Sequence, residues 1–465
     1  MVLRRASRFL LSTALAGVLS LGPAFGASLT DALITAYQTS PLLESSRASL
    51  RSLDENVAQA RSQKRPQVDA SISANTDTNV IEALDERVDS LQAALNASLL
   101  IFDNGQTRAS LDAARNTIAA ARADLVDVEQ FVLFSAVEAY LDVRQNEEFV
   151  RLASNDVERQ LETLNATRNR FEVGEVTRTD VSQSEARVAS SRSILADSEG
   201  ALEIARQAYL AAVGVLPTNL ERVPPLPEVP ASLEEATAVA LRMNPQIIAA
   251  QFAADAASFD VERAIAAKGP TVRVFGRAGA ERGNAFGQTY DGNTFGSAGV
   301  EAAMPLYTGG RNDSLVRQAQ AVLDQRRYQV QEAGRAVTQQ VAAAWIELET
   351  ARVSIVARRE QAEAARIAAE GVAEEARLGA RSTIDVLDAD QERLQADAEV
   401  VRALRNEYVA TYGVLRAMGL LTVKHLQLGI ETYDPDVYFA RVQSAPIGGY
   451  DTSVIDRIRS RWDPR

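Results

Sequence analysis

Three aspartates within six positions are the residues of this sequence whose type and spacing most suggest chemistry. They are Asp385, Asp388 and Asp390, in the stretch LGARSTIDVLDAD. Asp385 and Asp388 share one face of a helix, whereas Asp390 points elsewhere. A calcium loop needs a glycine at its sixth position and a glutamate at its twelfth, and neither is correctly placed here. Catalytic carboxylates line a cleft with other polar groups, and no such set is evident.

The residues alone favour a simpler role for these aspartates, as the solvated start of a helix. Carboxylates just after a turn complement the positive end of the helix dipole. The motif also occurs 205 residues earlier, in EVGEVTRTDVSQSE, where Gly174 and Asp180 take the places of Gly379 and Asp385. A repeated motif indicates a repeated structural role.

The rest of the chain repeats in the same way. The stretch SLTDALITAYQTSPLL, from Ser28, aligns with SLEEATAVALRMNPQI at an offset of 204, and FDNG, from Phe102, aligns with YTGG at 205. Such self-similarity indicates a duplicated architecture. We predict a repeat at 27–216, a proline-rich linker at 217–231, a second repeat at 232–421 and a C-terminal tail at 422–465.

The N-terminal residues 1–26 read as a secretory signal peptide: Arg4, Arg5 and Arg8 precede a short apolar run that ends in small residues. Removing these three arginines takes the formal net charge from −13 to −16, which disfavours nucleic acid and anionic lipid as partners. The absence of cysteine excludes disulfides and thiolate metal sites, and the single histidine, His425, is expected to be an ordinary tail residue. We expect no cofactor and no metal.

Proline and glycine placement predicts very long helices. Residues 107–173 contain neither, which favours one helix of about 67 residues and about 100 Å. A second helix is expected at 177–213 and a third at 233–268. Because these two together match the length of the first, we expect the chain to run down once in one piece and return in two, with the linker at half height. Tyr140 and Trp345 are expected to pack between helices.

The segments between the prolines and the long helices alternate apolar and polar residues, which is typical of strands. The apolar faces include Val68, Ile72, Leu91 and Leu95 in the first half, and residues 272–280 and 298–306 repeat the pattern. Residues 77–89 and 282–293 are expected to be loops that face the cell exterior. No apolar run is long enough for a transmembrane helix, so a membrane protein of this sequence must form a β-barrel.

Four strands are too few to close a spanning barrel, which needs about eight. Two chains would close a narrow barrel filled by side chains, and three would close a twelve-stranded barrel with an open lumen. We prefer three.

The tandem halves, the signal peptide, the TDV and IDVLDA turns and the FDNG and YTGG junctions together resemble the TolC family of outer-membrane efflux and secretion channels, over residues 28–421. The resemblance implies a mainly α protein with a transmembrane β-barrel. Each chain of a homotrimer would give four strands to a twelve-stranded barrel, and the tandem long helical hairpins would form a periplasmic α-barrel. It also implies outer-membrane lipid, a periplasmic adaptor protein, and an inner-membrane ABC exporter or proton-driven pump as partners.

The tail, which includes LGIETYDPDVYFARVQSAPIG, is similar to tails of alphaproteobacterial members that serve type I secretion. This ranks protein secretion slightly above small-molecule efflux. The main alternative is a periplasmic coiled-coil adaptor or scaffold without a channel, against which the amphipathic strands and the duplication argue. An enzyme is not expected, because no nucleophile, metal set or phosphate loop is visible.

The resemblance also assigns roles to the turn residues. Threefold symmetry would gather Asp385 and Asp388 into rings that select cations at the closed periplasmic tip. Thr179, Asp180 and Arg381 match positions that tie neighbouring helices together in the family. This sequence departs from the family pattern at Ala376, where well-known members carry an aromatic residue.

Overall fold

The computed structural model describes residues 28–81, 84–285 and 288–444. The predicted signal peptide lies outside this range. The helices are α1 (Leu29–Thr39), α2 (Pro41–Ser62), α3 (Gln106–Glu172), α4 (Arg178–Val213), α5 (Leu233–Met243), α6 (Pro245–Ala266), α7 (Arg311–Arg377), α8 (Thr383–Ala417) and α9 (Pro435–Ser444), and the strands are β1 (Gln67–Ile81), β2 (Leu84–Phe102), β3 (Thr271–Ala285) and β4 (Gln288–Ala303).

Two helices of equal length span the helical part of the molecule. α3 and α7 have 67 residues each, which confirms the long helix predicted from the lack of proline and glycine. Each begins after a glycine in the left-handed region, Gly105 with φ of 90° and Gly310 with φ of 84°. A residue with a Cβ adopts this conformation only with strain, so the glycines of FDNG and YTGG mark the change from strand to helix.

A charged contact fixes the first of these junctions. Asp103 accepts a hydrogen bond from the backbone N–H of Thr107 at 2.7 Å, and it forms an ion pair with Lys64 Nζ at 2.8 Å. Burial opposes ionisation of Asp103, but the hydrogen bonds from Lys64 and Thr107 outweigh it and hold its pKa at about 2. The carboxylate is therefore charged at every physiological pH and joins α2 to the start of α3.

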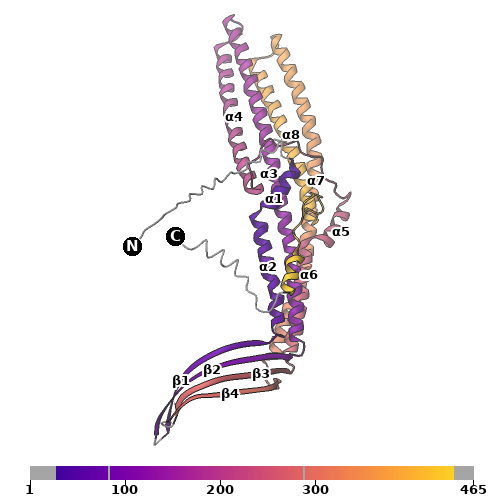
Figure 1. The fold of residues 1–465 in the computed structure, drawn as a ribbon. Coiled ribbons are helices and arrows are strands. Elements are labelled where there is room, and N and C mark those ends of the chain that lie inside the picture. The colour runs from indigo at the N-terminus through magenta and orange to yellow at the C-terminus, as the bar shows by residue number, and fades with distance from the viewer. Residues whose placement is uncertain (1–27, 82–83, 286–287, 445–465) are drawn as a thin grey trace, which may run out of the picture.

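The return path consists of shorter helices. In Figure 1, α4 runs beside one half of α3 and α6 lies beside the other half, near the strands. This confirms the expectation that the chain runs along the helical part once as a single helix and returns as separate helices. The predicted helix at 177–213 is confirmed as α4.

The predicted single helix at 233–268 is wrong, because the chain breaks there into α5 and α6. Asn244 is extended, with φ of −67° and ψ of 125°, and its side chain caps α6 at the backbone N–H of Gln246. Pro245 disfavours the helical conformation of the residue before it and begins a new helix. The first repeat has the same break, where Ser40 precedes Pro41.

The four strands form one antiparallel sheet in the order β1-β2-β3-β4 (Figure 1). The strands are longer than predicted, and the assignment of residues 77–89 and 282–293 to loops is wrong for most of their length. Asp77 pairs with Val88, Glu281 with Asn293, and the pairing continues to Ala285 and Gln288. Polar residues ended the alternation in sequence, but backbone ladder bonds do not require apolar side chains.

The predicted apolar face of the sheet is confirmed. Val68 and Ile72 are 70% and 80% exposed, and their cross-strand partners are Ala97 and Ala93. Val300 lies opposite Val274 in the second hairpin. A row of exposed aliphatic side chains on one face of a sheet fits contact with lipid.

The described helices include none that is long and apolar enough to cross a membrane.

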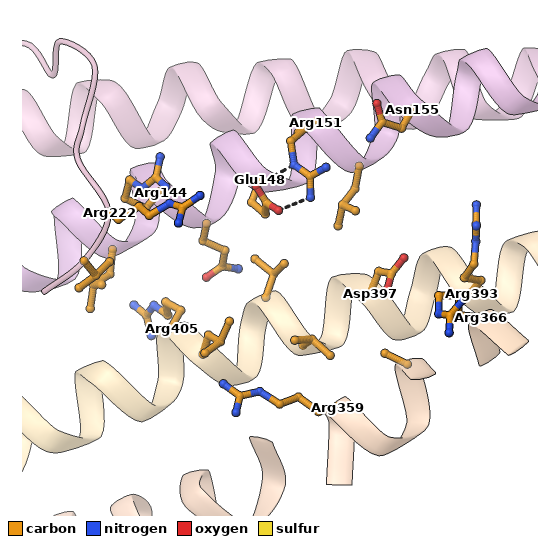
Figure 2. Close-up of a pocket in the computed structure, with 18 of the residues that line it drawn as sticks. Arg144, Glu148, Arg151, Asn155, Arg222, Arg359, Arg366, Arg393, Asp397 and Arg405 are labelled. Carbon is orange, nitrogen blue, oxygen red and sulfur yellow. Dashed lines mark hydrogen bonds and ion pairs between the residues drawn. The ribbon is translucent and has the colours of Figure 1, made fainter. Parts of the chain in front are cut away.

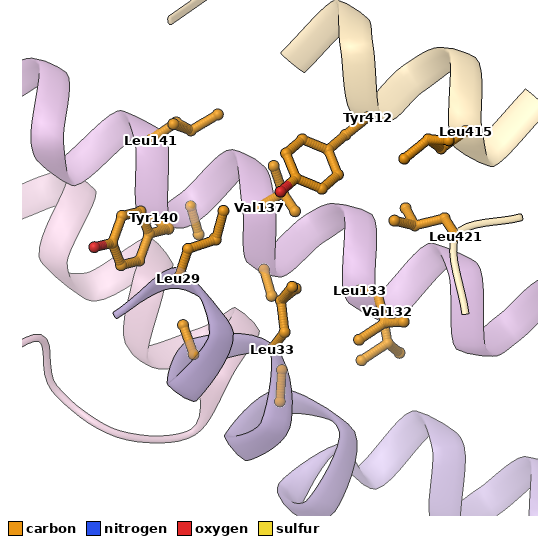
Figure 3. Packing of buried hydrophobic residues seen from close by; sticks show 14 of the residues in the cluster. Leu29, Leu33, Val132, Leu133, Val137, Tyr140, Leu141, Tyr412, Leu415 and Leu421 are labelled. Atoms are coloured by element: carbon orange, nitrogen blue, oxygen red, sulfur yellow. The ribbon is translucent and has the colours of Figure 1, made fainter. Parts of the chain in front are cut away.

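The main core lies where α1 meets α3 and α8, with further contacts from α4 and the segment after α8. Figure 3 shows Leu29 and Leu33 of α1 directed at Val137 and Tyr140 of α3. Tyr140 is fully buried, and its hydroxyl donates to the carbonyl of Glu221 at 2.8 Å. Trp345 of α7 belongs to the same core. The expectation that these two aromatic residues pack between helices is confirmed.

The C-terminal tail docks against the first helices through α9. Tyr438 donates to Glu55 at 3.0 Å, and Asp436 pairs with Arg122 at 2.8 Å. Asp54 lies at this contact and is 0% exposed, and neither of its carboxylate oxygens has a hydrogen-bond partner. His425 is exposed, and its backbone N–H donates to the Thr422 hydroxyl at 3.2 Å.

Burial raises the pKa of Asp54, and the nearby Glu55 and Asp436 carboxylates raise it further, while Arg122 acts in the opposite direction. A carboxyl whose folded-state pKa is raised stabilises the fold when it is protonated, so this contribution falls as pH rises through the raised pKa. Protection of the α9 amides, corrected for intrinsic exchange rates, is therefore expected to fall as the pH rises from below the ordinary pKa of an aspartate to neutrality in hydrogen-exchange experiments.

Asp54→Asn removes the titrating group and keeps its shape. We expect α9 protection in this variant to be nearly independent of pH and higher than in the wild type at pH 8, by about 1 kcal/mol of local opening free energy. The amides of α4 serve as an internal reference. The explanation is wrong if the variant retains the pH dependence of the wild type.

Candidate functional site

Two turns at the end of the molecule opposite the strands hold the residues that the sequence singled out (Figure 1). One joins α3 to α4 and the other joins α7 to α8. Gly174 and Gly379 take positive φ values of 82° and 78°. In the first turn the N–H of Glu175 bonds the carbonyl of Arg170 at 2.9 Å, and the second turn makes the equivalent bond at 2.8 Å. This geometry is a glycine-dependent helix stop.

The repeated aspartates start the next helices by the same mechanism. The Thr177 hydroxyl donates to the Asp180 carboxylate at 2.7 Å, and the backbone N–H of Asp180 donates to that hydroxyl at 3.3 Å. Ser382 and Asp385 form the same capping box with the same two distances. Each box satisfies amide groups that have no partner within the helix.

These caps set the charge of both carboxyls. The hydroxyl and backbone hydrogen bonds from Thr177 lower the pKa of Asp180, and those from Ser382 lower the pKa of Asp385. Both groups are therefore ionised well below neutral pH. Within one chain, the role of helix start accounts for both residues.

Asp388 has a different environment from Asp385. Its carboxylate forms an ion pair with Arg187 of α4. The Asp388 side chain is 62% exposed and that of Arg187 is 32% exposed, so this contact lies at the surface. Such pairs typically contribute about 0.2–1 kcal/mol. The contact nonetheless joins the α3–α4 hairpin to the α7–α8 hairpin near their tips.

Sequence reasoning missed Arg187. The signal that could have found it is its spacing from Asp180, seven residues, which places both on one face of α4 two turns apart. Its partner on the other hairpin, however, depends on how the two hairpins pack, and the spacing of residues in the sequence does not give that packing.

The other residues that were predicted to link neighbouring helices make their contacts within their own hairpins. Arg381 donates through Nε to Glu375 at 2.7 Å, which braces the turn between α7 and α8. Thr179 is exposed on the first turn of α4, and Asp180 caps that helix. Their contacts with neighbouring protomers stay predictions. Ala376, at the position of the family aromatic residue, is buried.

Asp390 points away from Asp385 and Asp388, as the helical spacing predicted. It faces Arg159 of α3, and its carboxylate lies 3.7 Å from Arg393 of its own helix. Burial raises its pKa, and the two arginines oppose that effect. A second buried carboxylate, Asp156, accepts from Ser191 at 2.6 Å beside this group. These residues form a polar contact between α3, α4 and α8, on the side of the tip turns that faces the strands.

Across the ranges 28–81, 84–285 and 288–444, no group of histidine and acidic side chains is arranged to hold a metal ion. Within the chain, Asp180 and Asp385 cap helices and Asp388 forms a surface ion pair. They lie at the far end of paired helices from a sheet with an apolar face.

A sheet that can contact lipid on one face, continued by helices of about 100 Å with charged tips, defines an outer-membrane duct that extends into the periplasm. The chain belongs to the family described as outer membrane efflux protein, whose profile matches residues 33–215 and 237–420.

Individual proteins agree with this assignment. The chain is 35% identical over 425 residues to the outer membrane efflux protein BepC of Brucella suis biovar 1 (strain 1330), covering 91% of this chain and 92% of BepC. It is 26% identical over 310 residues to the alkaline protease secretion protein AprF of Pseudomonas aeruginosa, covering 64% and 63% of the two chains. The outer membrane protein VceC of Vibrio cholerae shares the fold, with a TM-score of 0.70 at 22% identity, over 84% of this chain and 96% of VceC. The scaffold alternative is not favoured by these relatives.

Proposed function

We propose that this protein is the exit duct of an export system and works as a homotrimer in which twelve strands close a barrel in the outer membrane. The helical hairpins then form a tunnel across the periplasm that is closed at the tips at rest. The observation that carries this proposal is the open four-stranded sheet, in which β1 and β4 form the outer edges.

The sheet edges require partners in a bilayer. Lipid cannot hydrogen-bond to backbone groups, so a strand edge within the hydrocarbon region must be paired. The same sheet order in three copies pairs β4 of each chain with β1 of the next. The exposed apolar residues of α7 support a neighbouring copy along the helices as well; they include Val322, Tyr328, Ile346 and Val353.

In this assembly the turns of three chains surround one axis. Asp385 and Asp388 would then form rings of negative charge that favour cations. Arg187 neutralises part of the Asp388 ring and connects α8 to α4 of the same chain. We propose that this ion pair helps to keep the duct closed, because opening must move one hairpin relative to the other.

The proposed partners are a periplasmic adaptor and an inner-membrane ABC exporter or proton-driven pump, because a closed passive duct needs a source of energy and a contact that opens it. The printed name of BepC supports efflux as the first candidate for the cargo, and that of AprF supports protein secretion as the second. Both cargoes need the same duct.

The purified mature protein is expected to be a trimer that requires detergent, since unpaired β1 and β4 edges cannot face lipid. Light scattering with the detergent contribution subtracted measures the mass directly. A monomer that remains soluble without detergent would rule out the proposal.

Arg187→Gln is expected to increase the open fraction of single channels in planar bilayers by about fivefold, because three weak ion pairs together contribute on the order of 1 kcal/mol to the closed state. Asp388→Asn should have a similar effect on opening, and the double variant should add little. Arg192→Gln is the control, because Arg192 lies on the same helix and forms no ion pair with any residue that the structure describes. Unchanged gating in Arg187→Gln would exclude the proposed link.

Replacing both Asp385 and Asp388 by alanine is expected to weaken cation selectivity, measured from reversal potentials in a salt gradient, because the negative rings are lost. Trimer mass should be retained. Asp390→Asn changes a carboxylate that points to another face of α8 and should leave the reversal potential near the wild-type value. If the double variant keeps the wild-type reversal potential, the two aspartates serve only as helix start and surface charge.

A further inference from the structure

A groove with three cations lies where the helices meet the sheet. It has a volume of about 430 Å³, within the range of about 300–1,000 Å³ that is usual for small-ligand sites. Its walls are the end of β2, the first turns of α3 and the loop that follows α2. The charged residues that line it are Lys64, Arg108 and Arg115, with Asp103 and Asp112.

One wall of this groove belongs to the apolar face of the sheet. The register of β2 against β3 shifts between Leu100 and Phe102. A bulge of this kind re-aims the side chains that follow it. Phe102 therefore pairs with Val272, which lies on the same face of β3 as Val274. The Phe102 side chain is 46% exposed and also lines the groove, so the groove opens directly beside the surface that fits contact with lipid.

The groove carries more positive charge than its carboxylates balance. Asp103 is buried and pairs with Lys64 at 2.8 Å. One carboxylate oxygen of Asp112 lies 2.9 Å from Nη1 of Arg115, and the other lies 4.0 Å from Nε of Arg108. Three cations thus share two carboxylates, in a chain whose net charge is −13. The positive end of the α3 dipole adds to this local excess.

Arg108 is the cation with the most unused hydrogen-bond donors. Its side chain is 90% exposed and forms no hydrogen bond with any residue that the structure describes. Arg108 and Arg115 are seven residues apart and share one face of α3. Helical side chains lean toward the N-terminus of their helix, which for α3 is the end at the sheet (Figure 1). This lean favours contact of both guanidinium groups with a phosphate at the membrane boundary.

We propose that the groove binds the headgroup of an anionic phospholipid in the leaflet of the outer membrane that faces the periplasm. Arg108 and Arg115 donate to the phosphate, whose oxygens match the fork of guanidinium N–H groups. Phe102 and the apolar face beside it contact the acyl chains. An anionic lipid fits better than a zwitterionic one, because the groove has a surplus of positive charge.

The whole-chain charge, which disfavours anionic lipid, did not indicate this site. That charge is a sum over 465 residues, whereas salt screens charges that lie more than about 8–10 Å from a bound phosphate. The groove lies at β2, an inner strand of the sheet, so pairing of the β1 and β4 edges with other chains does not involve it. The inference uses only the position of the sheet in the outer membrane and goes beyond the proposed duct.

The test measures lipid binding by the full-length mature protein after it has been depleted of lipid in a neutral detergent. Native mass spectrometry counts the lipids that stay bound when phosphatidylglycerol or phosphatidylcholine is added at equal concentration. Both lipids carry a phosphate, but only phosphatidylglycerol has a net negative charge. The wild type should therefore retain phosphatidylglycerol in preference, and this preference should fall as salt is raised.

The Arg108→Gln/Arg115→Gln variant should bind phosphatidylglycerol about tenfold more weakly, because two charge-assisted donors are lost. Arg108→Lys/Arg115→Lys keeps the charge without the fork of donors and should bind more tightly than the glutamine variant. The matched control is Arg222→Gln/Arg359→Gln, which removes two exposed arginines from a separate groove on the helical wall (Figure 2). The control should bind phosphatidylglycerol like the wild type.

Equal retention of the two lipids, or unchanged phosphatidylglycerol binding in the glutamine variant, overturns the proposal. An equal loss in the control variant would indicate a general effect of net charge and would overturn it as well. Displacement of the lipid by inorganic phosphate, at concentrations where chloride has no effect, would indicate a site for free phosphate and has the same consequence. None of these results changes the trimer mass or the conductance on which the proposed duct depends.

Discussion

The pairing of backbone hydrogen bonds in lipid is the constraint on which this structure depends. A four-stranded sheet leaves two edges, and lipid offers them no donor or acceptor. The edges must therefore find other copies of the chain, and closure by rotation fixes an axis. In the proposed trimer, that axis would bring together the α7 faces that one chain leaves exposed and would place the tip turns around a common centre. The proposed roles of Asp385 and Asp388 thus follow from a requirement at the opposite end of the molecule.

Local chemistry made much of this fold predictable. The length of α3 followed from the absence of proline and glycine, and the strand positions from apolar alternation. The ends of the strands did not follow, because ladder bonds continue where the side chains become polar. The break at Asn244 was missed although Pro245 was visible, since the helical composition on both sides outweighed one proline. The contact of Arg187 with Asp388 depends on how the two hairpins pack, which periodicity does not encode.

Duplication preserved the backbone more faithfully than the charges. Both tip turns end a long helix at a glycine and begin the next with a capping box, with matching distances. The position that corresponds to Arg187 in the second half is Glu392, of opposite charge. The two halves can therefore share turns and caps while, at this position near the tips, only the first half carries a cation that pairs with the other half. In the proposed opening, this difference would give each hairpin its own part.

The equal length of α3 and α7 limits how this protein can change. Each residue inserted into one of these helices would advance its far end by about 1.5 Å and rotate it by about 100°. The change would misplace one tip turn relative to its neighbour and turn buried side chains toward water. Neither helix has a loop along its 67 residues that could absorb the insertion. Changes in the reach of the duct would therefore have to occur in both repeats together and in whole multiples of the packing repeat.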